Sequence, residues 1–259
     1  MNLLPPGIAQ RTEEWYEARK GMITASDFKI AGANSVSGSF VFGKVIPRPF
    51  ASNDAMAWGC RMEDLICKVY EAVYECHVRE YGLLKHADAP WIGASPDGAV
   101  VESGVLLEIK APYSRKMNQI KSRIEKGRPF PANDRANLHD RYAYQVLGQL
   151  EVCDLTYCDF TVAQIDEMDE DVFWQTRRVA DDPHKYGVVL DTRKRDGESG
   201  TVYVTSEPAA SESELKAWLA CREKELQVEK SWYVHVRELS VTRVKRDRSK
   251  WDEIRRNLE

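Results

Sequence analysis

Two short motifs in this sequence place carboxylates beside a lysine. The first is Ser95-Pro96-Asp97-Gly98, and the second, a little further along the chain, is Leu107-Glu108-Ile109-Lys110. Because side chains alternate between the two faces of a strand, Glu108 and Lys110 are expected to point to the same side. A carboxylate and an ammonium group on one face could act together on a substrate.

A hairpin is expected to bring Asp97 to the same place. The segments 98–101 and 105–110 have the pattern of strands, and Glu102-Ser103-Gly104 between them suits a tight turn. Asp97 begins the first strand, so it can approach Glu108 although the two are separated in the chain. Hard carboxylate oxygens bind Mg²⁺, and a neighbouring lysine can orient water or help to deprotonate it. The combination suits a magnesium-dependent phosphodiesterase, whereas each motif alone is more often a turn or a surface pair.

Two helices are expected to flank this hairpin. Apolar residues recur every three or four positions from Asp54 to Cys76, and Glu63 lies on the flank of that stripe. From there its carboxylate can reach over the edge of the core. A second helix, expected from Arg135 to Cys153, carries Gln145 at the margin of its apolar face.

The order of the remaining elements predicts a mixed α/β fold with a central mixed β-sheet flanked by helices. No repeat or long linker divides the chain, so residues 1–259 are expected to form one domain, with an insertion around 165–230. Cap residues at Thr12 and Thr24 indicate two short helices. The other expected strands are 77–86, 156–163, 172–179, 187–190, 201–205 and 232–241, and the other expected helices are 113–126, 212–228 and 249–258.

The composition is that of a globular protein with a full core, with 43% hydrophobic and 30% charged residues among 259. Neither an apolar run of about 18 residues nor a basic segment followed by an apolar stretch occurs. We therefore expect no membrane span, no secretory signal and an intracellular protein. The six cysteines lack CxxC spacing, which argues against structural zinc. Motifs for ATP binding, metalloproteases and esterases are also absent from the sequence.

Charge is distributed unevenly along the chain. The formal net charge of -4 by itself argues against a polyanionic partner. However, residues 110–128 hold seven basic residues and one acid, while residues 151–171 hold eight acids and no lysine or arginine. Such segments are most often solvated faces, although the basic one could meet a phosphate backbone. Trp15, Trp58 and Trp91 lie near the motifs and are expected in the core rather than stacked on bases.

A helical glutamate, then Asp97, then Glu108-x-Lys110 resembles the PD-(D/E)xK nuclease superfamily, which implies a restriction-endonuclease-like core. Within it, Trp15 followed by Arg19, Gly21 and Ile23-Thr24-Ala25-Ser26 is similar to the N-terminal signature of lambda-type phage exonucleases and YqaJ-like viral recombinases. Two further matches are Gly59-Cys60-Arg61-Met62-Glu63 and Tyr144-Gln145-Val146-Leu147-Gly148-Gln149. The resemblance runs from Trp15 to about Cys153.

The resemblance implies a role for each matching residue. Asp97, Glu108 and the backbone carbonyl of Ile109 would hold metal, and Glu63 would contribute through a second ion or a water. Two Mg²⁺ ions are implied, with Mn²⁺ able to substitute. The implied catalytic residues are Glu63, Asp97, Glu108, Lys110, which would position the attacking water, and Gln145, which would hold that lysine or water. The residues that match the family's 5′-phosphate pocket are Arg19, Ser26, Ser95 and Arg115.

Three details stay open in the sequence. Family members often carry another acid upstream, for which Asp88 is the nearest candidate. Lys116 could replace Arg115 as the second basic phosphate ligand. Leu147 stands where a second glutamine is common, and Gln149 could compensate.

The resemblance also implies an activity. It is Mg²⁺-dependent 5′-to-3′ digestion of linear duplex DNA, which releases 5′-mononucleotides and leaves 3′ single-stranded tails for recombination by strand annealing. A ring-shaped homotrimer, a single-strand annealing partner and, for a phage protein, the cytoplasm of a bacterial host are implied as well. The alternatives are a structure-selective or nicking endonuclease of the same fold and a catalytically idle protein that binds DNA ends.

Overall fold

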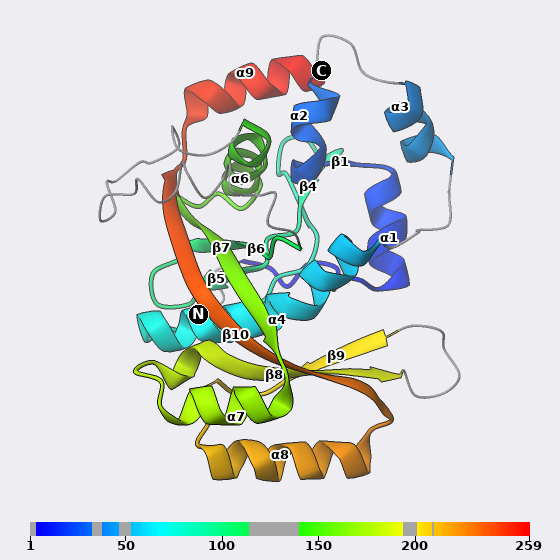
Figure 1. Ribbon diagram of the computed structural model, residues 1–259. Helices are drawn as coiled ribbons and strands as arrows, with labels where there is room; N and C mark the ends of the chain where they lie inside the picture. Colours follow the sequence, from blue (N-terminus) through cyan, green and yellow to red (C-terminus); the bar gives the residue numbers. More distant parts are fainter. Residues whose placement is uncertain (1–3, 33–37, 47–52, 114–139, 194–200, 209) are drawn as a thin grey trace.

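The computed structural model describes residues 4–32, 38–46, 53–113, 140–193, 201–208 and 210–259. It contains a strongly curled sheet with helices packed around it (Figure 1). In order across this seven-stranded sheet, the strands are β2 (Val78–Arg79), β5 (Gly98–Val100), β6 (Leu106–Lys110), β7 (Tyr157–Met168), β10 (Val228–Lys245), β8 (Tyr186–Arg193) and β9 (Thr201–Thr205). A small second sheet has the order β1 (Ile23–Thr24), β4 (Ile92–Ala94) and β3 (Leu84–Lys85).

Both sheets are mixed, because β6 pairs with β7 and β1 pairs with β4 in parallel, while the other described pairs are antiparallel. The predicted class, a mixed sheet flanked by helices, is therefore confirmed. The two longest strands, β7 and β10, pair along most of their length and run from one end of the molecule to the other (Figure 1).

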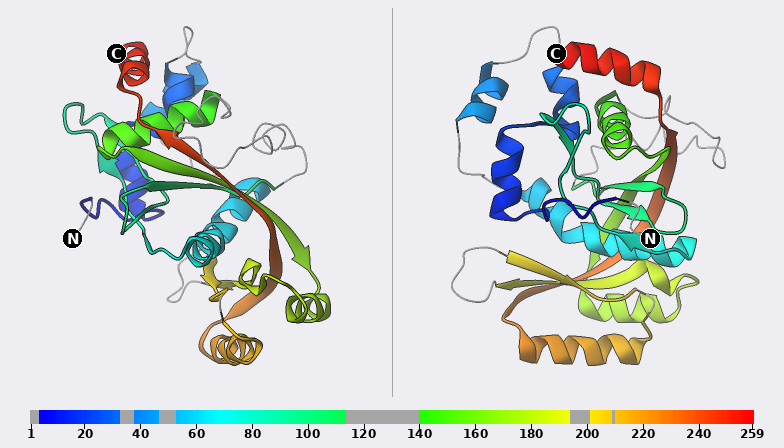
Figure 2. Two further views of the ribbon diagram at one scale, coloured as in Figure 1. Left: turned by 90° about the vertical axis from the view of Figure 1, so that its left-hand side faces the viewer. Right: turned by 180° about the vertical axis from the view of Figure 1, so that it is seen from behind.

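Two long helices cover opposite faces of the sheet, α4 (Asp54–Tyr74) and α6 (Asp140–Val152) (Figure 2). Alternation along β6 divides its side chains between them. Leu106 joins the apolar cluster under α6, whereas Leu107 and Ile109 join the cluster under α4. Glu108, next in the alternation, accordingly lies on the α6 side of the strand.

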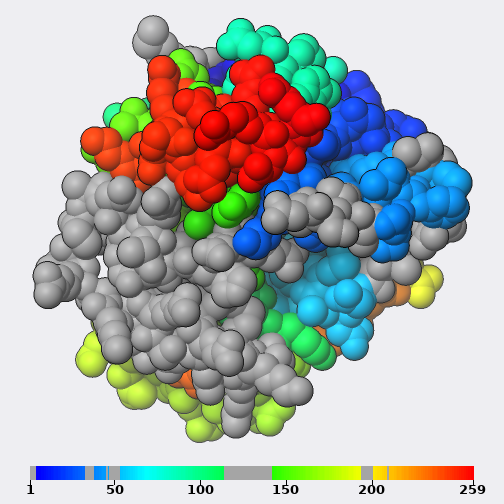
Figure 3. Space-filling model, turned by 90° about the horizontal axis from the view of Figure 1, so that it is seen from above, coloured from blue at the N-terminus to red at the C-terminus, as the bar shows by residue number. Residues whose placement is uncertain are grey.

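The outer side of α6 is covered by the C-terminal helix and by two short helices from the N-terminal part of the chain. The helix α9 (Arg248–Leu258) lies over it, and the short helices η1 (Ala25–Asp27) and α2 (Phe28–Ala31) pack beside it (Figure 3). Phe28 is fully buried. A Cβ atom added at Gly148 of α6 would lie 2.0 Å from the Phe28 ring, so only glycine permits this close approach.

Further elements extend the N-terminal half. The helix α1 (Glu13–Lys20) begins after Thr12, whose hydroxyl accepts a hydrogen bond from the Trp15 N–H, which confirms the expected cap. The helix α3 (Gly38–Val45) was not predicted. The expected strand 77–86 is wrong as one element, because β2 and β3 are short and belong to different sheets. The expected helix 113–126 lies almost wholly outside the described residues.

The segment 172–179, predicted as a strand, forms the helix α7 (Glu170–Arg178) instead. Its β-branched residues favour a strand locally, but Phe173 and Trp174 pack with β8 and with α8 (Glu212–Glu225) in a third apolar cluster. A turn η4 (Pro183–Lys185) precedes β8. Most of the described part of the expected insertion, 165–230, consists of α7, β8, β9 and α8, and β8 and β9 extend the large sheet. None of the described helices is both long and apolar enough to cross a membrane.

Candidate active site

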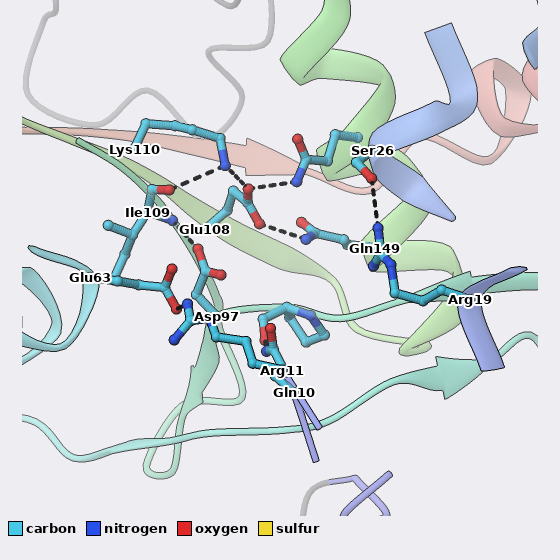
Figure 4. A network of polar contacts seen from close by, with 12 residues as sticks. Gln10, Arg11, Arg19, Ser26, Glu63, Asp97, Glu108, Ile109, Lys110 and Gln149 are labelled. Carbon is cyan, nitrogen blue, oxygen red and sulfur yellow. Dashed lines mark hydrogen bonds and ion pairs between the residues drawn. The ribbon is translucent and has the colours of Figure 1, made fainter. Parts of the chain in front are cut away.

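The hairpin of β5 and β6 brings the two motif carboxylates together. Gly98 pairs with Leu107 in antiparallel register, and the same register continued by one residue sets Asp97 opposite Glu108. The backbone N–H of Ile109 donates a hydrogen bond of 2.6 Å to Asp97 Oδ2. The Asp97 carboxylate is thereby aimed at the end of β6 (Figure 4).

Glu108 does not lie on an open surface, because α6 covers it and leaves its residue 1% exposed. Three donors satisfy its carboxylate. Lys110 Nζ and Gln145 Nε2 donate to Oε1, the amide at 2.6 Å, and Gln149 Nε2 donates to Oε2 at 2.6 Å. Lys110 also donates to the Ile109 carbonyl at 3.2 Å. The predicted sharing of one face by Glu108 and Lys110 is confirmed, but the face is an interior one.

The electrostatics of this group follow from burial and from repulsion between acids. Burial raises the pKa of Asp97 well above its usual range, and the charges of Glu108 and Glu63 raise it further. Burial alone would lower the pKa of Lys110, but the charges of Glu108 and Asp97 outweigh it and raise that pKa. Lys110 is therefore a charged donor in this arrangement and not a free amine.

Glu63 approaches from α4 and is paired with Arg11. Arg11 Nη2 lies 2.6 Å from Glu63 Oε1. Burial raises the pKa of Glu63, and the guanidinium opposes that rise. Within the described residues, no three His, Cys, Asp or Glu side chains form a cluster suited to a metal ion. Glu63 therefore lies beside Asp97 and Glu108, but the three carboxylates do not form one metal-binding cluster.

The oxygen donors nevertheless fit a divalent cation. Glu108 is buried and the half-buried Asp97 lies beside it. The repulsion by Glu108, which adds to the effect of desolvation on the pKa of Asp97, is what a cation between them would relieve. The Ile109 carbonyl supplies a third hard oxygen next to them. The buried Oε1 atom of Gln149 also lacks a hydrogen-bond partner among the described residues.

A cavity of about 150 Å³ joins these carboxylates to a second group of polar side chains. Asp97, Glu108 and Lys110 line one part of it, and Arg19, Ser26 and Ser95 line another. Gln145 also lines the cavity, so seven of the predicted site residues share one space. Arg115 lies outside the described residues, as does Lys116. Asp88 does not line the cavity.

The second group has the properties of an anion site. Arg19 lies over the Trp15 ring, with 4.3 Å from its guanidinium carbon to the ring centroid, and donates to Thr24 Oγ1 at 3.1 Å and to Ser26 Oγ at 3.4 Å. Burial lowers the pKa of Arg19. In the described part of the chain, no carboxylate forms an ion pair with this arginine. A half-buried cation ringed by hydroxyls is suited to phosphate oxygens.

Ser95 and Asp27 complete this end of the cavity. Trp15 Nε1 donates to Ser95 Oγ at 3.0 Å, which leaves the Ser95 hydroxyl hydrogen for an anion. Asp27 Oδ2 accepts from the Thr24 N–H at 3.0 Å and from Lys44 Nζ at 2.7 Å. Asp27 therefore holds the turn that carries Ser26, and α3 is fastened to that turn through Lys44.

Four residues in or near this site were missed or misjudged from the sequence. The role of Gln149 stayed open, although its spacing of four from Gln145 on a helix places both amides on one face. Trp15 was expected in the core but lines the cavity, and Trp91 is 36% exposed. Gln10 also lines the cavity, and no local motif marks it.

The structure resembles solved exonucleases in fold. An exonuclease named LHK-Exo, crystallised with dAMP, has a TM-score of 0.55 and 22% identity, with 95% of this chain and 89% of that chain covered. The alkaline exonuclease LHK-Exo from Laribacter hongkongensis, in a second structure, has a TM-score of 0.54 and 21% identity over the same shares of the two chains. A phage-related exonuclease from Haemophilus somnus 129PT has a TM-score of 0.51 and 9% identity, with 92% and 90% covered.

Sequence comparison gives a curated relative and a family. Uncharacterized protein R354 of Acanthamoeba polyphaga mimivirus is 30% identical over an alignment of 180 residues, which covers 63% of this chain and 31% of that protein. The chain thus spans about a third of that relative's length. The model of the YqaJ-like viral recombinase domain matches residues 14–156, more than half of the chain and nearly the stretch predicted from the motifs. This chain belongs to the YqaJ-like viral recombinase domain family.

Proposed function

We propose that this protein is a Mg²⁺-dependent 5′-to-3′ exodeoxyribonuclease. It would act on the ends of linear double-stranded DNA, release 5′-mononucleotides and leave 3′ single-stranded tails for strand annealing. The observation that carries the proposal is the single cavity shared by the acid and lysine group, Asp97, Glu108 and Lys110, and the anion site around Arg19.

The anion site favours an end over an internal site. Its side chains Arg19, Ser26 and Ser95 line one part of the cavity and can donate to several oxygens of one phosphate. A terminal 5′-phosphate leaves more oxygens free for such donors than an internal phosphate, which is esterified on both sides. With the terminal phosphate held by Arg19, Ser26 and Ser95, the next phosphodiester would lie toward the carboxylates. The structural neighbour LHK-Exo was crystallised with dAMP, a 5′-mononucleotide, which agrees with this product class.

The residues on β6 and α6 divide the chemistry between them. Mg²⁺ held by Asp97, Glu108 and the Ile109 carbonyl, with Glu63 serving a second ion, would supply Lewis acidity at the scissile phosphate. Lys110 would donate a hydrogen bond that orients the attacking water. Gln145 and Gln149 would hold the Glu108 carboxylate in place, since both donate to it.

Assembly and partners belong to the same proposal. We propose a homotrimer that encircles its DNA, a single-strand annealing protein as partner, and action inside the cell, in the cytoplasm of a bacterial host for a phage protein. An acidic exterior around a basic lining would disfavour DNA outside the channel, which suits a chain of net charge -4.

The test is digestion of a linear duplex labelled at its 5′ or 3′ end, beside a covalently closed circle of the same sequence, with Mg²⁺, Mn²⁺ or EDTA. Release of the 5′ label as a mononucleotide, only with metal and with the circle intact, supports the proposal. Cutting of the circle would show an endonuclease instead. Binding without any product would show an idle end-binding protein.

A further inference from the structure

Arg11 has an unusual backbone for its residue type. Its φ of +63° lies in the left-handed region, which costs a non-glycine residue free energy. The segment before it is tied down, because Gln10 Nε2 donates to the Tyr81 carbonyl at 3.0 Å and to the Pro96 carbonyl at 2.9 Å. Strain of this kind persists where the surroundings enforce it, and it is concentrated at functional sites.

The strained backbone places the Arg11 guanidinium beside two carboxylates, those of Glu63 and Asp97. Arg11 Nη2 lies 2.6 Å from Glu63 Oε1, and the guanidinium is also close enough to Asp97 for their charges to interact (Figure 4). Pro96, which anchors Gln10, directly precedes Asp97 in the chain. The same short segment therefore fixes the position of Arg11 relative to both carboxylates.

This cation competes with any metal ion at Glu63. A guanidinium bound to Oε1 occupies that oxygen and repels a second positive charge beside it. The contact is not sealed, since the Arg11 side chain is 43% exposed and that of Glu63 is 27% exposed. Incoming DNA can therefore reach the guanidinium, and phosphate oxygens are its preferred partners.

We propose that Arg11 is a positioning residue that occupies Glu63 until DNA arrives and then transfers to a backbone phosphate, which leaves Glu63 free for metal. The inference rests on the proposed function, because it assigns an order to the loading of its two ions. The ion at Asp97 and Glu108 binds without DNA. The ion at Glu63 binds tightly only with DNA.

The experiment measures Mn²⁺ binding by electron paramagnetic resonance, with purified protein and no DNA, for the wild type and for Arg11→Gly. Glycine is the suitable replacement because it adopts the positive φ without strain. We expect the weaker Mn²⁺ site to bind roughly three- to fivefold more tightly in Arg11→Gly, the upper part of the range that corresponds to one partly exposed charge pair. Adding a duplex whose terminal linkages resist cleavage should shrink this difference to less than about 1.5-fold, because the wild-type guanidinium then binds phosphate instead.

Two further variants locate the effect. Glu63→Gln, made in both backgrounds, should abolish the difference, because the contested oxygen then carries no charge. Arg178→Ala removes a guanidinium at 2.9 Å from Glu212 on a distant helix, and it should leave Mn²⁺ binding unchanged.

Equal isotherms for wild type and Arg11→Gly would overturn the inference, as would absence of Mn²⁺ binding in both. Cleavage is assayed in parallel to keep the two proposals apart. If Mn²⁺ binding differs between wild type and Arg11→Gly but the wild type digests no DNA, the exonuclease proposal is refuted and the competition at Glu63 stands. If the wild type digests DNA and the two isotherms are equal, the exonuclease proposal stands and the competition at Glu63 is refuted.

Discussion

At the scale of single residues, Lys110 is the group whose state most constrains the chemistry. It donates to Glu108 and to the Ile109 carbonyl, and its raised pKa keeps it charged. A charged ammonium orients water and stabilises negative charge, but it accepts no proton. We therefore assign it an electrostatic role.

Lys110→Ala should lower the single-turnover cleavage rate by roughly 10²–10³-fold, the effect of removing one electrostatic donor. Binding of a duplex end should be nearly unchanged, because the anion site around Arg19 is left intact. Rapid-quench digestion and fluorescence anisotropy measure the two quantities. A variant that cleaves at the wild-type rate would refute the assigned role.

Arg19→Ala should remove the preference for phosphorylated ends. A charge-assisted hydrogen bond contributes about 1.5–3 kcal/mol, so the advantage of a 5′-phosphate over a 5′-hydroxyl should fall by roughly 10- to 100-fold. The measurement is kcat/KM on matched duplexes that differ only in that phosphate. Equal losses on both substrates would instead place Arg19 outside the phosphate site.

Asp97 links the stability of the metal-free protein to pH. Its pKa is higher in the folded state than in the unfolded chain, so the folded protein binds the extra proton. The stabilisation is therefore complete below about pH 4 and is lost as pH rises toward the raised pKa. Asp97→Asn cannot ionise there and should escape the loss.

In EDTA at pH 8, the free energy of unfolding of Asp97→Asn should be about 1–3 kcal/mol larger than that of the wild type. At pH 4 the two free energies of unfolding should be nearly equal. Mg²⁺ should stabilise the wild type at pH 8 and leave the variant unaffected. Urea denaturation across pH, with and without metal, measures this. A wild type whose stability rises between pH 4 and pH 8 relative to the variant would contradict the assignment.

At the scale of elements, α6 determines whether Glu108 is held correctly. The helix carries both glutamines that donate to Glu108, and its distance from the N-terminal turn is set where Gly148 meets Phe28. The contact between Gly148 and Phe28 therefore sets the position of the glutamines that hold Glu108, and also the position of the turn that carries Ser26.

Gly148→Ala should destabilise the protein by about 1–3 kcal/mol, because the new Cβ would lie 2.0 Å from the Phe28 ring. Cleavage should fall as well, since the displaced helix carries Gln145 and Gln149. Gly59→Ala on α4 is the matched control, because nothing lies within 4 Å of its added Cβ. That control should gain about 0.5–1 kcal/mol from helix propensity. Thermal denaturation measures both effects. Equal changes in Tm for Gly148→Ala and Gly59→Ala would refute the close packing of Gly148 against Phe28.

At the scale of the whole molecule, one curled sheet extends from the cavity to a second region, the apolar cluster formed with α7 and α8. β7 and β10 pass from the cavity end to the cluster formed by α7 and α8, and β6 pairs with β7 next to the site. The far region is therefore joined to the site by continuous hydrogen-bonded strands.

The proposed ring predicts the mass of the particle in solution. Analytical ultracentrifugation without DNA should give three times the mass of one chain, because a ring must assemble before it can thread a DNA end. Digestion of a long duplex should then proceed through many nucleotides per encounter. A particle of single-chain mass at concentrations that support full activity would rule out the ring.

The family and most of the local elements could be predicted from the sequence alone. Alternation and helical periodicity depend on neighbours within a few positions, so β6, α4 and much of α6 were predictable. Residue type and spacing pointed to Asp97, Glu108 and Lys110, and the family resemblance added Arg19, Ser26, Ser95 and Gln145. The structure brings all of them into one cavity. Family membership followed from the same residues.

Features that depend on contacts between distant residues became visible only in the folded molecule. The pairing of Arg11 with Glu63 and the anchoring of Gln10 at Pro96 join positions far apart in the chain, which no local pattern encodes. The β-branched residues of 172–179 favoured a strand until packing against α8 and β8 made a helix more stable. Burial of Glu108 was likewise a result of α6 covering β6, because exposure is a property of packed layers rather than of a single strand.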